Sequence, residues 1–112
     1  MNHIALAGEA SALEILLEGR VFDAKEAKEK GLVTRVVPDA DVESEARATA
    51  QRIADGAPLV ARWHKKFARR LRDPRPLTPE EYDEGFACFG TGDFQIGYRA
   101  FLAKEKPAFK GK

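Results

Sequence analysis

The side chains that could do chemistry are few, and they stand far apart in the sequence. His3 and His64 have no cysteine or further histidine at metal-ligand spacing, so the sequence indicates no metal site. Cys88 lies among aromatic residues and is interpreted as core filler; the alternative, a reactive thiol, needs an activating environment that no neighbour supplies. Glu80 and Glu81 are better explained by a helix start than by acid–base catalysis. No phosphate-binding loop, nucleophile elbow or HExxH motif occurs, so we expect no complete catalytic constellation in this chain.

One polar cluster remains, a basic segment from Arg62 to Arg75 in which Asp73 is the single acidic residue. We interpret it as the solvated face of an amphipathic helix, because Trp63 and Phe67 belong to a separate apolar face. Two alternatives stay open: a surface for a small anionic ligand, and a nucleic-acid surface. The basic residues are Arg62, Lys65, Lys66, Arg69, Arg70, Arg72 and Arg75.

Composition points to a folded and mostly helical domain. Of the 112 residues, 44% are hydrophobic and 33% are charged, which argues against disorder. The net charge of +1 argues against a polyanion as a general partner. One cysteine fits a reducing compartment, and no apolar run approaches the length of a membrane span, so we expect a soluble cytoplasmic chain.

The first half of the chain predicts short helices that end at glycines. Apolar residues recur at helical spacing over Glu9–Glu18. Asp23 followed by Glu26 predicts a capping box at the start of the next helix, and Gly31 is expected to end that helix in a left-handed conformation. The β-branched segment Leu32–Val37 predicts the only strand, which needs a partner to form a sheet.

The second half predicts longer helices. One covers Asp41–Asp55, and another begins at Pro58, a favoured first helical position. Thr78 with Pro79 and Glu81 predicts a further capped helix. Asp93 is expected to cap a last helix that ends near Lys104, followed by a tail, Ala108–Lys112. Apolar residues at a spacing of four form a seam on the Pro58 helix, and an aromatic stripe follows it: Leu59, Trp63, Phe67 and Leu71, then Tyr82, Phe86 and Phe89. The fold class is therefore mainly α with one short strand, and residues 1–112 form a single helical unit.

Three stretches carry a resemblance to a known family. The first reads ALEILLEGRVFDAKEAKEKGLVTRVVP, from Ala12 to Pro38. The second is Ala57-Pro58-Leu59, with Lys65 seven residues beyond the proline. The third contains Asp93, Gly97, Ala100-Phe101, Lys104 and the end Lys106-Pro107-Ala108-Phe109-Lys110-Gly111. In this order and spacing they resemble the C-terminal helical part of the crotonase family, the enoyl-CoA hydratases and isomerases, from about Gly8 onward.

The resemblance implies that the catalytic residues and the residues for subunit assembly lie in different parts of the protein. In the family, the catalytic carboxylates and the oxyanion hole lie upstream of the segment that matches Gly8, so the resemblance implies that residues 1–112 lack the N-terminal catalytic core, and we expect the chain to be inactive alone. The matching segment assembles subunits into trimers and hexamers. Phe101 matches the phenylalanine near the adenine of coenzyme A, and Lys104 matches the lysine near the phosphorylated ribose. The alternatives are a core phenylalanine and a merely solvated lysine.

The sequence thus predicts the C-terminal part of an enoyl-CoA hydratase or isomerase that contributes subunit assembly and CoA contacts. No cofactor is required, and a coenzyme A thioester is the expected ligand. A homo-oligomer and acyl-CoA are the expected partners, with no membrane and with nucleic acid disfavoured. Two rivals stay open: a self-associating structural module without ligand, and a nucleic-acid binder acting through Arg62–Arg75.

Overall fold

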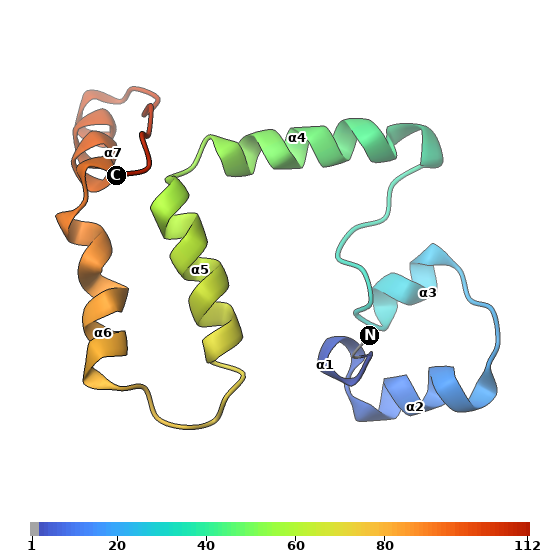
Figure 1. The fold of residues 1–112 in the computed structure, drawn as a ribbon. Coiled ribbons are helices and arrows are strands. Elements are labelled where there is room, and N and C mark those ends of the chain that lie inside the picture. Colours follow the sequence, from blue (N-terminus) through green and yellow to red (C-terminus); the bar gives the residue numbers. More distant parts are fainter. Residues whose placement is uncertain (1–2) are drawn as a thin grey trace. The chain divides into compact units, whose positions relative to one another are not determined.

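The computed structural model describes the backbone of residues 3–112 and the side chains from residue 5 onward. Within this range the chain is built from helices joined by loops, and it divides inside α4 into two compact units, one ending at Glu45 and the other covering Ala46–Lys112 (Figure 1). The elements in order are α1 (His3–Ala7), α2 (Glu9–Glu18), α3 (Ala24–Glu29), η1 (Asp39–Asp41), α4 (Val42–Ala54), α5 (Pro58–Arg70), α6 (Pro79–Phe86), η2 (Ala87–Gly90) and α7 (Gly92–Ala103).

The first unit is held by a charged network between α2 and α3. Arg20, in the loop between these helices, pairs with Glu26 of α3 and with Glu18 of α2, the latter at 2.7 Å from Nε to Oε2. Lys30 donates to Glu14 of α2 at 2.7 Å. These bonds link α2 to α3 through side chains, without a large apolar core between them; Ala12 alone among the described residues of this unit is fully buried.

The start of α3 agrees only in part with the predicted capping box. Asp23 accepts a hydrogen bond from the backbone N–H of Glu26 at 2.9 Å, as an N-cap residue should. The return bond from the Glu26 carboxylate to the Asp23 backbone is not formed within the described residues, because the carboxylate binds the Arg20 guanidinium instead. The helix start was therefore predicted correctly, and the reciprocal bond was not.

The end of α3 confirms the conformation predicted for Gly31. Its φ is +76°, and its N–H donates to the Lys28 carbonyl at 3.0 Å. The N–H of Leu32 donates to the Ala27 carbonyl at 2.9 Å. This pair of bonds is a Schellman motif, which satisfies carbonyls left free at a helix end.

The strand predicted over Leu32–Val37 was wrong for this chain. These residues have no regular secondary structure, and residues 3–112 contain no strand with which they could form a ladder. A strand exists through hydrogen bonds to a neighbouring strand, so β-branched composition alone cannot form one. Val33 and Val36 remain 42% and 40% exposed.

In the second unit, the helix starts follow the predicted residues. Pro58 occupies the first turn of α5. Thr78 and Glu81 form the predicted capping box of α6: the Glu81 N–H donates to Thr78 Oγ1 at 3.2 Å, and the Thr78 N–H donates to Glu81 Oε2 at 2.8 Å. Each bond satisfies a backbone donor that the helix itself cannot pair.

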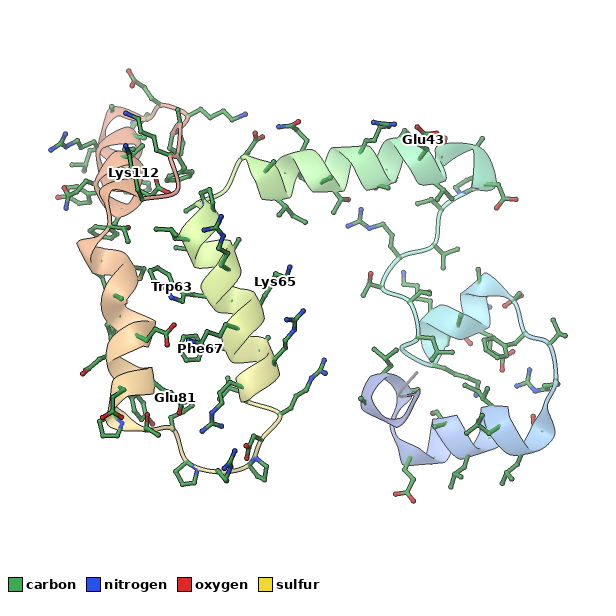
Figure 2. The ribbon with its side chains drawn as sticks, in the orientation of Figure 1. Glu43, Trp63, Lys65, Phe67, Glu81 and Lys112 are labelled. Carbon is green, nitrogen blue, oxygen red and sulfur yellow. The ribbon has the colours of Figure 1, made fainter. Side chains whose placement is uncertain are left out.

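Helices α5 and α6 lie side by side and antiparallel (Figure 1). Lys66 binds Glu84 at 2.5 Å and Arg70 binds Glu81 at 2.5 Å, so the order of partners along α6 is the reverse of that along α5. Trp63 and Phe67 lie on the side of α5 toward α6, whereas Lys65 points away from it (Figure 2). The aromatic residues of α5 thus face away from Lys65, but the Lys66 ammonium lies 6.0 Å from the centroid of the Phe67 ring, so the predicted separation of aromatic and basic residues is only partial.

Much of the apolar surface of both units stays exposed. Leu16 and Leu17 of α2 are 60% and 81% exposed. In the second unit, four aromatic rings form a continuous series with centroid separations of 6.3, 5.2 and 6.3 Å, and all four are exposed. The rings are Phe86, Phe89, Phe94 and Tyr98, which we call the aromatic series.

We expect Gly31→Ala to lower the free energy of unfolding by roughly 1 kcal/mol, because a side chain disfavours the left-handed conformation. An added Cβ would also lie 3.3 Å from the Leu6 carbonyl oxygen. Gly85→Ala is the matched control: Gly85 lies within α6 with no atom near its added Cβ, so alanine should stabilise the chain. Thermal or urea unfolding measures both variants, and a neutral or stabilising Gly31→Ala would contradict the assignment.

Candidate functional site

The candidate site is the last helix and the chain end that folds back on it. Helix α7 is capped by Thr91, whose Oγ1 accepts a hydrogen bond from the Phe94 N–H at 3.1 Å. The prediction that Asp93 caps this helix was therefore wrong. Asp93 is the second residue of α7, so its carboxylate is free to bind another segment.

Asp93 binds the chain end through both carboxylate oxygens. Oδ1 accepts from the Lys110 N–H at 2.6 Å, and Oδ2 accepts from the Gly111 N–H at 2.7 Å. The Asp93 N–H in turn donates to the Lys112 carbonyl at 2.9 Å. Asp93 is only 2% exposed. A buried charge is costly unless hydrogen-bonded, and consecutive backbone N–H groups together with a helix N-terminus form a favourable setting for an anion.

The chain end also packs against the middle of α7. A Cβ added at Gly97 would lie 3.3 Å from Cε1 and 3.5 Å from Cζ of Phe109, so glycine lets the ring approach the helix closely. A Cβ added at Gly92 would lie 3.0 Å from the Lys112 carbonyl oxygen. The tail predicted over Ala108–Lys112 is thus docked on α7, and residues 105–112 are called the strap from here on.

An apolar pocket of about 260 Å³ lies beneath the strap, between α5, η2 and α7. Cys88 lines it and is half-buried, so it is not the fully buried core residue that was predicted. Phe109 of the strap and Asp93 also line it. The remaining lining residues are Ala57, Val60, Thr91, Phe94, Gly97 and Tyr98.

Lys104 turns the chain back toward α7. It is the one described residue other than glycine with a positive φ, at +55°. The Lys104 N–H donates to the Phe101 carbonyl at 3.2 Å, and the Glu105 N–H donates to the Ala100 carbonyl at 2.9 Å, which is again a Schellman motif. A side chain in this conformation costs about 1–2 kcal/mol relative to a right-handed turn.

The two residues predicted to contact coenzyme A lie at this turn. Phe101 is 81% exposed and belongs to the last full turn of α7. Lys104 is exposed one residue beyond the helix end. Within the described chain, Phe101 is therefore not a core residue, and both side chains are open to solvent.

A further bond fixes the strap near its start. Lys106 Nζ lies 3.1 Å from Oδ2 of Asp55, at the end of α4, and Gln51 donates to the other oxygen of Asp55 at 2.9 Å. The amide of Gln51 and the ammonium of Lys106 together lower the pKa of Asp55. Lys106 is thus partly neutralised within the chain, unlike a lysine free to bind a ligand.

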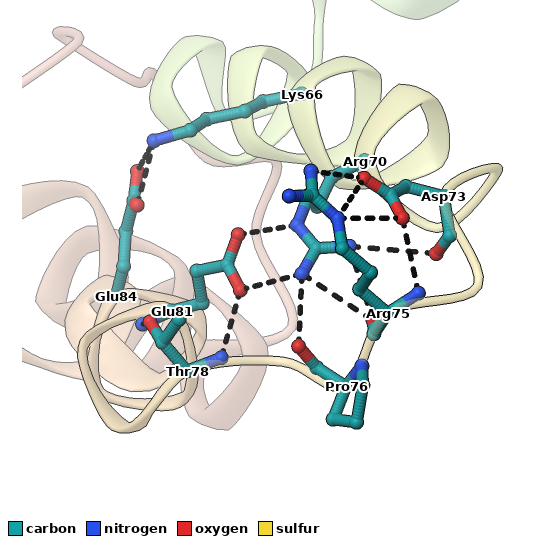
Figure 3. A network of polar contacts seen from close by, with 8 residues as sticks. All are labelled: Lys66, Arg70, Asp73, Arg75, Pro76, Thr78, Glu81 and Glu84. Atoms are coloured by element: carbon teal, nitrogen blue, oxygen red, sulfur yellow. Dashed lines mark hydrogen bonds and ion pairs between the residues drawn. The ribbon is translucent and has the colours of Figure 1, made fainter.

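The basic segment Arg62–Arg75 is partly neutralised in the same way. Arg70 makes a bidentate contact with Glu81, at 2.5 and 3.1 Å, while Lys66 binds Glu84 and Arg75 binds Asp73 (Figure 3). The Arg70 guanidinium, followed by the Thr78 N–H, lowers the pKa of Glu81. Lys66 and Arg70 therefore belong to the contact with α6, and the Arg70 side chain is only 20% exposed, so the prediction of a solvated face does not hold for Arg70. The pairing weakens the nucleic-acid alternative.

The described residues also bear on metal binding and on membrane insertion. Between residues 3 and 112, no group of three or more His, Cys, Asp or Glu residues could hold a metal ion; the His3 side chain lies outside the described atoms. None of the described helices has the length and apolarity needed to cross a membrane.

Comparison with known proteins identifies the family. Residues 3–112 match the sequence profile of the enoyl-CoA hydratase/isomerase family, so the chain belongs to that family. The chain is 38% identical over 104 residues to a "probable enoyl-CoA hydratase" of Mycobacterium tuberculosis, covering 91% of this chain and 40% of that protein.

Solved structures agree in fold. An enoyl-CoA hydratase/carnithine racemase from Magnetospirillum magneticum is 52% identical with a TM-score of 0.94, and the match covers 97% of this chain and 41% of that one. An enoyl-CoA hydratase from Bacillus anthracis is 30% identical with a TM-score of 0.85, covering 97% of this chain and 43% of that one. The chain thus spans about two-fifths of the length of these relatives, which confirms the resemblance to a C-terminal helical part of the crotonase fold.

We expect Glu81→Gln to destabilise the chain near neutral pH, because glutamine cannot pair with the Arg70 charge. The lowered pKa of Glu81 means that its contribution is present above the ordinary glutamate value of 4.5 and is lost as the pH falls through the lower folded value. The stability difference between wild type and variant should therefore shrink below about pH 4.5. Urea unfolding across this range measures it, with the exposed Glu80→Gln as control; a difference that is independent of pH would contradict the ion pair.

Proposed function

We propose that this chain is the C-terminal part of a cytoplasmic enoyl-CoA hydratase or isomerase, and that it contributes subunit assembly and a coenzyme A contact. The observation that supports the ligand contact is the exposed Phe101 ring three residues before the exposed Lys104, at the end of α7. An aromatic ring can stack on the adenine, and an ammonium can bind the phosphate of the ribose. Membership of the family makes a coenzyme A thioester the ligand to test first.

The proposal assigns no reaction step to this chain. Asp93 is buried and engaged with the strap, and Glu81 is engaged with Arg70 and the start of α6. Cys88 lines an apolar pocket. None of these groups has both a free carboxylate or thiolate and a neighbouring donor set for a developing oxyanion. We therefore assign the acid–base chemistry of the whole enzyme to its other part.

Subunit assembly is supported by the exposed apolar surface. The side chains of the aromatic series and of the leucines of α2 are exposed to solvent when each unit is considered alone. Soluble monomers seldom expose contiguous apolar patches larger than a few hundred Å². A second copy of the chain, or the remainder of the enzyme, would remove this surface from water.

Coenzyme A affinity tests the proposed contact. We expect Lys104→Gln to weaken the binding of coenzyme A about tenfold, because a charge-assisted bond to phosphate is lost. Dephospho-coenzyme A lacks that phosphate, so its affinity should not respond to the same change. Calorimetry measures both, with Lys28→Gln as the control because Lys28 is exposed on α3, outside the basic segment. Equal losses for the two ligands would contradict the assignment of Lys104.

Catalytic inactivity is tested with crotonyl-CoA. We expect no loss of the conjugated thioester absorbance above that of a denatured control when the purified chain is added. Turnover that is clearly faster would show that this chain holds chemistry that the proposal assigns elsewhere.

Self-association is tested by light scattering after gel filtration at micromolar concentration. We expect a mass above that of one chain, and we expect Phe89→Ser, in the centre of the aromatic series, to reduce it. Val21→Ser is the control, because Val21 is 97% exposed but lies in the loop between α2 and α3, outside the aromatic series. A stable monomer on dilution would show that the exposed surface does not bind a second copy.

A further inference from the structure

The strap and the Lys104 turn form one closed structure. The chain leaves α7 at Lys104 and reverses. It is fixed by Lys106 on Asp55, and it ends with Lys110 and Gly111 on the Asp93 carboxylate. The loop thus begins and ends on α7.

The Lys104 turn and the bonds to Asp93 stand at the two ends of this loop. Lys104 has a left-handed conformation that residues with a side chain avoid. Reversal of the chain at this residue lets the strap reach α7, and the bonds to Asp93 hold the strap there. When two elements share one closed loop, loss of either should relax the other.

We propose that Asp93 is the positioning residue of the coenzyme A contact: by holding the strap, it keeps Lys104 in its left-handed turn and so fixes the place of the ammonium. The inference rests on the proposed function for its ligand, but the positioning itself concerns this chain alone. Asp93 touches no ligand in this account and acts through the strap.

The choice of aspartate follows from the bonds. Two backbone N–H groups point at two carboxylate oxygens, so both oxygens must be acceptors. Asparagine offers one acceptor and one donor, which would set an N–H against an N–H. Asp93→Asn is therefore a small change in shape that removes at least one of the two bonds. Asp83→Asn, at an exposed position on α6, is the matched control.

Nuclear magnetic resonance on the full chain tests the positioning without ligand. In Asp93→Asn we expect the Lys104 ¹³Cα shift to move toward its random-coil value. We also expect amide exchange at Glu105, whose N–H is bonded to Ala100, to rise about tenfold or more. Asp83→Asn should leave the Lys104 ¹³Cα shift unchanged and the Glu105 exchange rate within about twofold of the wild-type rate. An unchanged Lys104 shift and Glu105 exchange rate in Asp93→Asn would overturn the proposal.

A rescue separates positioning from a general loss of structure. Glycine adopts the left-handed conformation freely, so Lys104→Gly in the Asp93→Asn background should restore the protection of the Glu105 amide. If Asp93→Asn does not fold, Gly111→Ala decides instead. Gly111 has φ of +76°, and alanine there weakens the strap from its outer end. Gly111→Ala should change the Lys104 readouts in the same direction, and failure to do so would overturn the proposal.

Coenzyme A is the ligand probe. Asp93→Asn should weaken its binding about tenfold while the Lys104 charge is still present, and the rescued double variant should regain the turn but not the affinity. If the wild type binds no coenzyme A and yet Asp93→Asn releases the turn, the proposed function fails and the positioning stands. If the wild type binds and Asp93→Asn leaves affinity and turn unchanged, the proposed function stands and the positioning fails.

Discussion

The second unit depends on one buried carboxylate. Asp93 binds two consecutive N–H groups of the chain end and donates its own N–H to the last carbonyl. These bonds hold the Phe109 ring against Gly97, where it closes one side of the apolar pocket. Burial of a carboxylate is costly, and the two hydrogen bonds offset part of that cost, so removing them would leave the desolvation cost uncompensated. The chain end is thereby part of the folded unit.

The rest of the chain is organised by surface charge and helix ends. Arg20 and Lys30 join α2 to α3 in the first unit, and Lys66 and Arg70 join α5 to α6 in the second. Few apolar side chains are fully buried, since the buried hydrophobic residues of the described chain are Ala12 and Ala100. Ion pairs of this kind contribute little stability when exposed. Because so few apolar side chains are buried, both units present apolar surface that suits a larger assembly. This agrees with a chain that spans about two-fifths of the length of its relatives.

The features that the sequence predicted correctly depend on bonds between residues that are close together in the chain. The starts at Pro58 and Thr78 and the glycine end at Gly31 involve residues a few positions apart, so their pattern is visible in the sequence. The Leu32–Val37 segment failed because a strand needs a distant partner. The role of Asp93 was missed for the same reason: its partners lie 17 and 18 residues away. Gly97 and Phe109 belong to the motif that resembles the family, but the close approach of the Phe109 ring to Gly97 is visible only in the structure.

Amide exchange at the chain end tests this account most directly. The backbone N–H groups of Lys110 and Gly111 are close to the C-terminus, where a free tail would exchange at the rate of an unfolded peptide. Because Asp93 binds both, we predict exchange at least about a hundredfold slower than in a peptide of the same sequence. Exchange of both amides at the peptide rate in the wild-type chain would show that the strap is not held by Asp93 and would contradict the account.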